Sequence, residues 1–144
     1  MADKQLILEI YVSLNVKMNK GAKTILVTGS GTGIGQAVAR KFAKSGYNII
    51  ILGRRKEPLI DASNILRQII TDEKYESSVT YYPGVDVSDF EAINAMFDKI
   101  STEFGQIDVV VNNAGVSGPV KIFTNSNFQE FKDCVSIHLT GTFW

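Results

Sequence analysis

Cysteine is nearly absent from this 144-residue sequence, in which Cys134 is the only one. A single thiol excludes a disulfide framework and a cysteine-only metal cluster, and it fits a reducing compartment. Charge of one sign is also lacking, because fifteen basic and fifteen acidic residues cancel. This balance argues against an electrostatic binder of nucleic acid or membranes. No apolar run approaches the roughly 20 residues that span a bilayer, and the N-terminus lacks a cleavable signal pattern, so we expect a cytoplasmic protein.

The remaining composition is that of one globular domain, since 44% of the residues are hydrophobic and can form a core. We interpret residues 1–20 as an N-terminal extension and residues 21–144 as the domain. Within it, apolar strand patterns alternate with helical patterns. Strands are expected at 24–28, 48–52, 79–85 and 107–111, and helices are expected to start near 33, 58, 88 and 125–127.

Apolar spacing also predicts which face of a helix is buried. In the first helix that face would carry Ile34, Val38 and Phe42. The segment 88–91 has the pattern of a capping box, with Ser88 as the N-cap of the third helix. The last helix shows one apolar stripe, formed by Phe128, Phe131, Val135 and Leu139.

Alternation of strands and helices with short loops implies a parallel sheet with right-handed crossovers. We therefore predict the α/β class, with a Rossmann-like doubly wound sheet in the strand order 3-2-1-4. The fold would be partial, because the further strands of a complete doubly wound sheet are not in this sequence. The segment 109–111 would then lie on an open edge. A ligand is expected across the carboxyl ends of the strands, near the switch between strands 1 and 4.

The most informative motif is the stretch Thr28-Gly29-Ser30-Gly31-Thr32-Gly33-Ile34-Gly35, between the first strand and the first helix. A strand that leads through a glycine turn into a helix N-terminus forms a phosphate site from backbone N–H groups. Glycine permits the backbone angles and the close approach that such a turn requires. The spacing differs from G-x-G-x-x-G, because Ile34 stands where the last glycine would be. It also differs from a Walker A loop, because no lysine follows before Lys41.

Three motifs in order resemble the short-chain dehydrogenase/reductase family. The glycine motif has the family's form T-G-x-x-x-G-I-G, Asp86-Val87 resembles its adenine-contacting pair, and Asn112-Asn113-Ala114-Gly115 resembles its second signature. The resemblance implies an oxidoreductase that moves a hydride between a nicotinamide cofactor and a small-molecule carbonyl or secondary alcohol. It also implies homo-oligomers for the full-length form.

The resemblance assigns cofactor contacts residue by residue. The motif glycines would hold the pyrophosphate, and a merely structural turn is the alternative. Asp86 would accept a hydrogen bond from the adenine amino group, with capping of the following helix as its alternative, while Asn112 would tie strands together. Gly31 is additional to the family pattern and would only loosen the loop. The implied cofactor-binding residues are Gly29, Ser30, Gly31, Thr32, Gly33, Ile34, Gly35, Arg54, Arg55, Asp86, Val87, Asn113, Ala114 and Gly115.

The end of the second strand indicates which cofactor is preferred. An acidic residue there would accept the ribose hydroxyls of NAD, but this chain has Arg54 and Arg55. Guanidinium groups match a 2′-phosphate, and in the family an arginine at the place of Arg54 accompanies NADP. The alternative is that both arginines are simply solvated. The family's frequent second basic residue is replaced by Thr32, yet the sequence favours NADP over NAD.

His138 stands where the family commonly has its catalytic asparagine, within a segment similar to N-L-x-G-x-F. A catalytic role and a structural role both stay open for it. Cys134 is interpreted as packing. No tyrosine of this chain has the family's Tyr-x-x-x-Lys pattern, so the sequence carries the cofactor part and is expected to be inactive alone. The rival interpretation is a non-catalytic nucleotide-binding module; a methyltransferase-type domain is disfavoured by Arg54 together with the Asn-Asn-Ala-Gly segment.

Overall fold

The structure, a computed structural model, describes residues 21–143, so the predicted extension 1–20 lies outside the described residues. Four parallel strands form one sheet in the order β3-β2-β1-β4, which confirms the predicted order. In this register Thr28 lies opposite Leu52, and Gly53 lies opposite Pro83. The carboxyl ends of β1, β2 and β3 therefore meet at one edge of the sheet. The strands are β1 (Thr24–Thr28), β2 (Asn48–Gly53), β3 (Val79–Pro83) and β4 (Val109–Val111).

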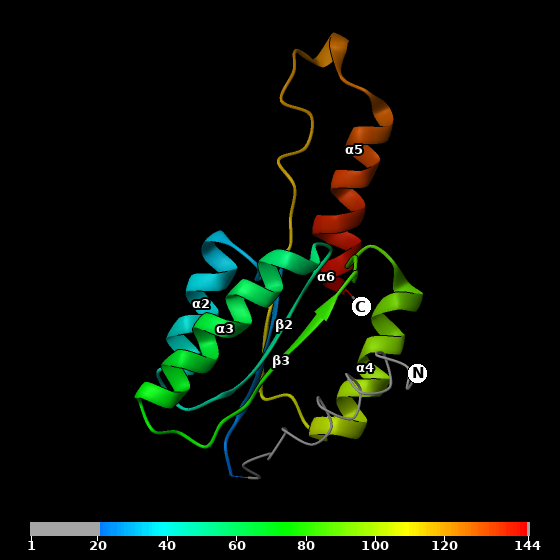
Figure 1. The fold of residues 1–144 in the computed structure, drawn as a ribbon. Coiled ribbons are helices and arrows are strands. Elements are labelled where there is room, and N and C mark those ends of the chain that lie inside the picture. The colour runs from blue at the N-terminus through cyan, green and yellow to red at the C-terminus, as the bar shows by residue number, and fades with distance from the viewer. Residues whose placement is uncertain (1–20, 144) are drawn as a thin grey trace, which may run out of the picture.

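The helices cover both faces of this sheet, as expected for a doubly wound fold (Figure 1). α2 and α3 lie on one face and α4 lies on the other, while α5 projects away from the sheet at its carboxyl edge. None of the helices in the described part is long and apolar enough to cross a membrane. Their bounds are α2 (Gly33–Ala43), α3 (Lys56–Asp72), α4 (Phe90–Phe104), η1 (Phe123–Asn125), α5 (Phe128–Val135), the π-helical η2 (Ser136–Thr140) and α6 (Gly141–Phe143).

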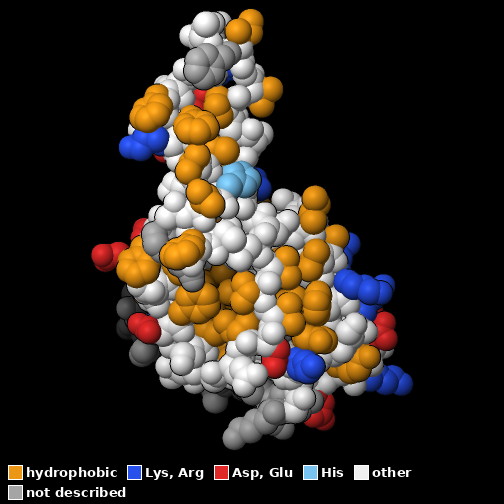
Figure 2. All heavy atoms as spheres, turned by 180° about the vertical axis from the view of Figure 1, so that it is seen from behind, with side chains coloured by type: hydrophobic (Ala, Val, Ile, Leu, Met, Phe, Trp, Pro, Cys, Tyr) orange, Lys and Arg blue, Asp and Glu red, His pale blue; other side chains and the backbone are white. Residues whose placement is uncertain are grey.

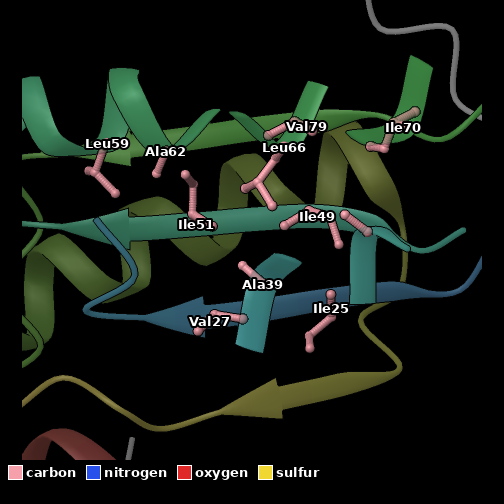
Figure 3. Close-up of a cluster of buried hydrophobic side chains, with 11 residues drawn as sticks. Ile25, Val27, Ala39, Ile49, Ile51, Leu59, Ala62, Leu66, Ile70 and Val79 are labelled. Atoms are coloured by element: carbon pink, nitrogen blue, oxygen red, sulfur yellow. The ribbon is translucent and has the colours of Figure 1, made fainter. Parts of the chain in front are cut away.

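The central strands are buried on both faces, and their alternating side chains feed two separate cores. One core lies between the sheet and α2 and α3; Figure 3 shows Ile49 and Ile51 of β2 beside α3 residues such as Leu66. The other lies toward α4 and contains Leu26, Ile50 and Leu52 with the buried side of that helix. Burial of each such side chain contributes about 1.5–3 kcal/mol, so the two cores fix the sheet that carries the site.

The predicted buried face of the first helix is right in part, because Val38 and Phe42 pack against the core but Ile34 does not. Gly35, Ala39 and Ala43 of α2 are buried, whereas Ile34 is 77% exposed. Val38 and Phe42 pack only partly buried against the core. Small residues on the inner face allow α2 to approach the sheet closely, and this turns the larger side chains toward its flanks. The exposed Ile34 instead lines the cleft described below.

The predicted cap of the third helix is also wrong by one position. The N-cap of α4 is Asp89, whose carboxylate accepts a hydrogen bond from Ala92 N at 3.0 Å. The Ser88 hydroxyl instead donates to Asp86 Oδ1. The last helix does begin as expected, because Asn127 caps α5 by accepting from Gln129 N.

The carboxyl side of the sheet exposes apolar surface. Within the described residues β4 pairs with one strand, β1, and Val110 is 48% exposed, so the predicted open edge is confirmed. Apolar side chains also gather on the projecting segment, as Figure 2 shows from behind. The exposed apolar residues of this segment are Val120, Ile122, Phe128, Phe131, Val135 and Leu139; Phe143 of α6 is exposed as well. The stripe predicted for α5 thus exists, and it is not buried against the described residues.

Candidate functional site

The glycine turn after β1 has the backbone geometry that the sequence predicts. Gly29 and Gly33 have φ angles of +62° and +59°, in the left-handed region where a Cβ is unfavourable. At Gly29 an added Cβ would lie 2.8 Å from Ala114 Cα, whereas at Gly33 it would meet nothing within 4 Å. The backbone at Gly33 therefore borders open space at the start of α2. Thr32, the N-cap, makes no side-chain capping bond, and the first-turn N–H groups remain available to an anion.

Two residues of the turn have structural tasks that the sequence did not reveal. The Ser30 side chain is buried; its hydroxyl donates to Val27 O at 2.8 Å and accepts from Leu52 N at 3.2 Å. It therefore links β1 to β2. Gly31 allows a close contact with α3, because an added Cβ would lie 3.0 Å from Pro58 Cβ. The interpretation of Gly31 as a residue that only loosens the loop is wrong.

A cleft of about 340 Å³ runs along the carboxyl ends of the strands, where the sequence predicts the ligand. Among the predicted cofactor residues, Ser30, Gly33 and Gly35 do not line it. Gly35 is buried, and an added Cβ there would lie 2.5 Å from Asn113 Nδ2. The predicted residues that the structure brings together in the cleft are Gly29, Gly31, Thr32, Ile34, Arg54, Arg55, Asp86, Val87, Asn113, Ala114 and Gly115.

Sequence reasoning missed several apolar members of this lining. Gly53 and Val85 flank predicted residues at the ends of β2 and β3, so proximity along the sequence is a signal that would have found them. Ile137 and Val116 come from segments whose approach depends on tertiary packing, and no local pattern indicates it. The missed residues are Leu52, Gly53, Pro58, Leu59, Val85, Val116 and Ile137.

Asp86 and Arg54 form an ion pair at the mouth of this cleft. Arg54 Nη1 lies 3.6 Å from Asp86 Oδ2, and the side chains are 59% and 32% exposed. The other carboxylate oxygen, Oδ1, accepts from Ser88 N at 2.9 Å and from Ser88 Oγ at 2.7 Å. Partial burial acts to raise the pKa of Asp86, but the Ser88 hydrogen bonds and the Arg54 charge together hold it below its usual value. Asp86 is therefore a carboxylate at neutral pH.

Asn113 ties β4 to β1, a task that the sequence analysis gave to Asn112. Asn113 Nδ2 donates to Thr28 O at 2.9 Å and to Gly29 O at 3.1 Å, whereas Asn112 is exposed. The Thr28 hydroxyl accepts from the backbone N–H groups of Asn113 and Ala114, at 2.9 and 2.8 Å. These bonds fix the segment after β4 against the glycine turn. The Asn113 amide nitrogen is thus used by the fold, and Asn113 also lines the cleft.

His138 lies in the π-helical turn η2 and contacts the loop that follows β4. Its Nε2 atom is 3.1 Å from Val116 N and 2.8 Å from Val116 O. Its ring also lies over Gly115, where an added Cβ would come 2.5 Å from Cε1. His138 itself does not line the cleft. π-Helical turns recur at functional sites, and this one brings helix and loop together beside the cleft.

The fold and the glycine turn define this chain as a Rossmann-like domain with its cleft at the carboxyl ends of the strands. A family model described as short chain dehydrogenase matches residues 23–144, and the chain belongs to that family. Its relatives include the 3alpha-hydroxysteroid dehydrogenase of Mediterraneibacter gnavus, 34% identical over 84% of this chain and 46% of the relative.

Solved structures show the same fold. An L-sorbose reductase from Gluconobacter frateurii, complexed with NADPH and L-sorbose, superposes with a TM-score of 0.74 at 28% identity. The match covers 85% of this chain and 44% of the reductase. An NAD+-bound xylitol dehydrogenase superposes with a TM-score of 0.75 at 31% identity. The match covers 88% of this chain and 45% of the dehydrogenase. The chain thus spans about half the length of these relatives. Both nicotinamide cofactors occur among them.

The residues present fit a dinucleotide better than a metal. Open backbone at Gly33, two arginines and one carboxylate line or border a single cleft. Among residues 21–143 no group of three or more His, Cys, Asp and Glu side chains is placed to hold a metal ion.

Proposed function

We propose that this chain is the nucleotide-binding part of an NADP(H)-dependent oxidoreductase that acts on a small carbonyl compound or secondary alcohol. The observation that carries the proposal is the position of Arg54 and Arg55. Both follow β2 directly and line the cleft, and neither of their neighbours Gly53 and Lys56 is acidic. Two arginines and no acidic residue among residues 53–56, at the end of β2, favour a ligand with a 2′-phosphate over one with free ribose hydroxyls.

The chain's own residues would bind and orient the cofactor. The first-turn N–H groups of α2, beside Gly33, would hold the pyrophosphate with the helix dipole. Asp86 would accept from the adenine amino group, and the backbone of Val87 would lie along the ring. The segment 113–115 would hold the nicotinamide-side ribose, and Arg54 and Arg55 would hold the 2′-phosphate. The bound nicotinamide would supply the hydride.

His138 would act as a positioning residue. It contacts the backbone of Val116, in the loop that continues the Asn-Asn-Ala-Gly segment, and so couples η2 to the wall of the cleft. The family's serine and Tyr-x-x-x-Lys are not in this sequence, so turnover by this chain alone is not expected. We further propose a cytoplasmic location, from the single cysteine, and assembly of the full-length form into homo-oligomers.

Fluorescence titration with NADPH and NADH tests the proposal. NADPH should bind more tightly, and Arg55→Gln should weaken NADPH by roughly tenfold with little change for NADH, because it removes one phosphate contact. Lys99→Gln, an exposed substitution on α4, is the control for a general loss of positive charge. Equal affinities would refute the NADP preference, and binding of neither would refute the nucleotide site. Binding without turnover in a full-length form would favour the non-catalytic module.

A further inference from the structure

Arg54 and Asp86, which the proposed function assigns to opposite ends of the adenosine moiety, contact each other in this structure. The sheet register explains the contact. Gly53 at the end of β2 lies opposite Pro83 at the end of β3, so the residues that follow the two strands are neighbours. Both side chains line the same cleft. Within this structure each is the ion-pair partner of the other.

The two oxygens of the Asp86 carboxylate have different surroundings. Oδ1 accepts two hydrogen bonds, from the Ser88 backbone N–H and the Ser88 hydroxyl. Because a carboxylate oxygen offers about two lone-pair sites, Oδ1 is fully used. Oδ2 is therefore the oxygen that a ligand in the cleft would reach, and it is Oδ2 that faces Arg54 Nη1.

We propose that Arg54 competes with an adenine ligand for Asp86 Oδ2 in the nucleotide-free protein. The inference rests on the proposed function, which gives Asp86 to the adenine amino group. The Arg54 guanidinium lies 3.6 Å from Oδ2 in the cleft, so the adenine amino group would have to approach the same oxygen beside a positively charged group that already neutralises it. When a ligand with a 2′-phosphate displaces Arg54 from Asp86, the guanidinium can form a new ion pair with that phosphate. A ligand without the phosphate offers Arg54 no such replacement. Arg54 thus strengthens binding of the phosphorylated ligand and weakens binding of the other.

The expected size of the competition follows from the geometry. At 3.6 Å the contact is longer than the 2.7–2.9 Å of a charge-assisted hydrogen bond, and the Arg54 side chain is 59% exposed. Exposed ion pairs of this kind change an equilibrium by about two- to fivefold. The gain in affinity for an unphosphorylated ligand on removal of Arg54 should have that size.

Calorimetric titration of the 144-residue chain with 5′-AMP and 2′,5′-ADP tests the competition. Arg54→Met keeps an apolar stem and removes every N–H donor. This variant should bind 2′,5′-ADP roughly tenfold more weakly and 5′-AMP about two- to fivefold more tightly. Lys99→Met is the control, because it removes one exposed positive charge of α4 outside the cleft; its affinity for 5′-AMP should stay unchanged.

Two outcomes of this titration would overturn the inference, and they can be told apart. If Arg54→Met leaves 5′-AMP binding unchanged or weakens it, Arg54 does not compete, and the inference fails while the proposed function stands. If the unmodified chain binds neither ligand, the proposed function fails and the inference with it. A measurement without substitution gives a second test. Added salt screens the ion pair, so uncharged adenosine should bind the unmodified chain more tightly at high salt, and an unchanged or weaker affinity would also overturn the competition.

Discussion

Gly35→Ala is expected to disrupt the junction between the first helix and the edge strand. Gly35 is the third residue of α2, and an added Cβ would lie 2.5 Å from Asn113 Nδ2 and 2.8 Å from Gly29 O. That amide nitrogen donates to both Thr28 O and Gly29 O, and these bonds hold the segment after β4 against β1. The new methyl group must therefore displace the amide or push the helix outward.

The magnitude follows from three terms. Loss of the two hydrogen bonds costs about 1–3 kcal/mol. A shift of closely packed backbone costs about 1–3 kcal/mol more. The higher helix propensity of alanine relative to glycine offsets about 1 kcal/mol of this loss of stability. The two costs exceed the helix term, so we expect Gly35→Ala to lower the free energy of unfolding by about 1–5 kcal/mol.

Urea unfolding followed by circular dichroism measures this loss. Ala37→Gly, on the exposed side of the same helix, is the control, because it reports helix propensity alone and should cost about 1 kcal/mol. In an Asn113→Ala background the cost of Gly35→Ala should shrink, because the methyl group no longer meets an amide. A Gly35→Ala protein as stable as its parent, or more stable, would show that the methyl finds room and would refute the reasoning.

Substitutions at three further residues test other contacts of the site. Ser30→Ala should lower the free energy of unfolding by about 1–3 kcal/mol, since Leu52 N–H loses a buried acceptor; urea unfolding measures it, and an unchanged midpoint would contradict it. His138 Nε2 contacts both Val116 N and Val116 O, and one imidazole nitrogen can either donate or accept, but not both. An asparagine amide has a donor and an acceptor, so His138→Asn should keep the melting temperature, whereas His138→Leu should lower it. The pKa of Asp86 is lowered in the folded state, so its contribution to stability is present above about pH 4 and is lost as pH falls through the folded pKa. Asp86→Asn should therefore reduce the acid dependence of the unfolding midpoint.

The order of the elements and their approximate places were predictable because they depend on local patterns. Continuous apolar runs predicted the buried strands of a parallel sheet, and the doubly wound arrangement then predicted the strand order that the structure shows. The positive φ angles of Gly29 and Gly33 were equally predictable, since only a glycine turn leads directly from such a strand into a helix.

Predictions of helix caps and of buried helix faces were wrong where two nearby residues could fill the same role. Ser88 and Asp89 are both good N-caps, and the choice depends on a tertiary contact, the carboxylate of Asp86, that uses Ser88. Likewise Ile34 fits a helical apolar stripe, yet the sheet requires the small residues Gly35 and Ala39 beneath α2. Hydrophobic periodicity finds large side chains and overlooks a face that is buried because its side chains are small.

The contacts that carry the site's chemistry were the least predictable. Arg54 and Asp86 are separated by 32 positions, and only the register of β2 against β3 brings them together. Sequence analysis could assign each to a ligand group by resemblance, but it had no means of showing that the two pair with each other. The competition that follows from this pair depends on the three-dimensional structure.

The apolar stripe of α5 shows the opposite limit of sequence reasoning. Phe128, Phe131, Val135 and Leu139 recur at helical spacing, and that spacing correctly predicts one apolar face. In the described residues this face is exposed, and Phe128 is 74% accessible. A row of exposed aromatic and aliphatic side chains is unfavourable in water, so burial of this face against another apolar surface would be favourable. The spacing of apolar residues therefore predicts that a helix has an apolar face, whereas the burial of that face is decided by the segments that pack against it.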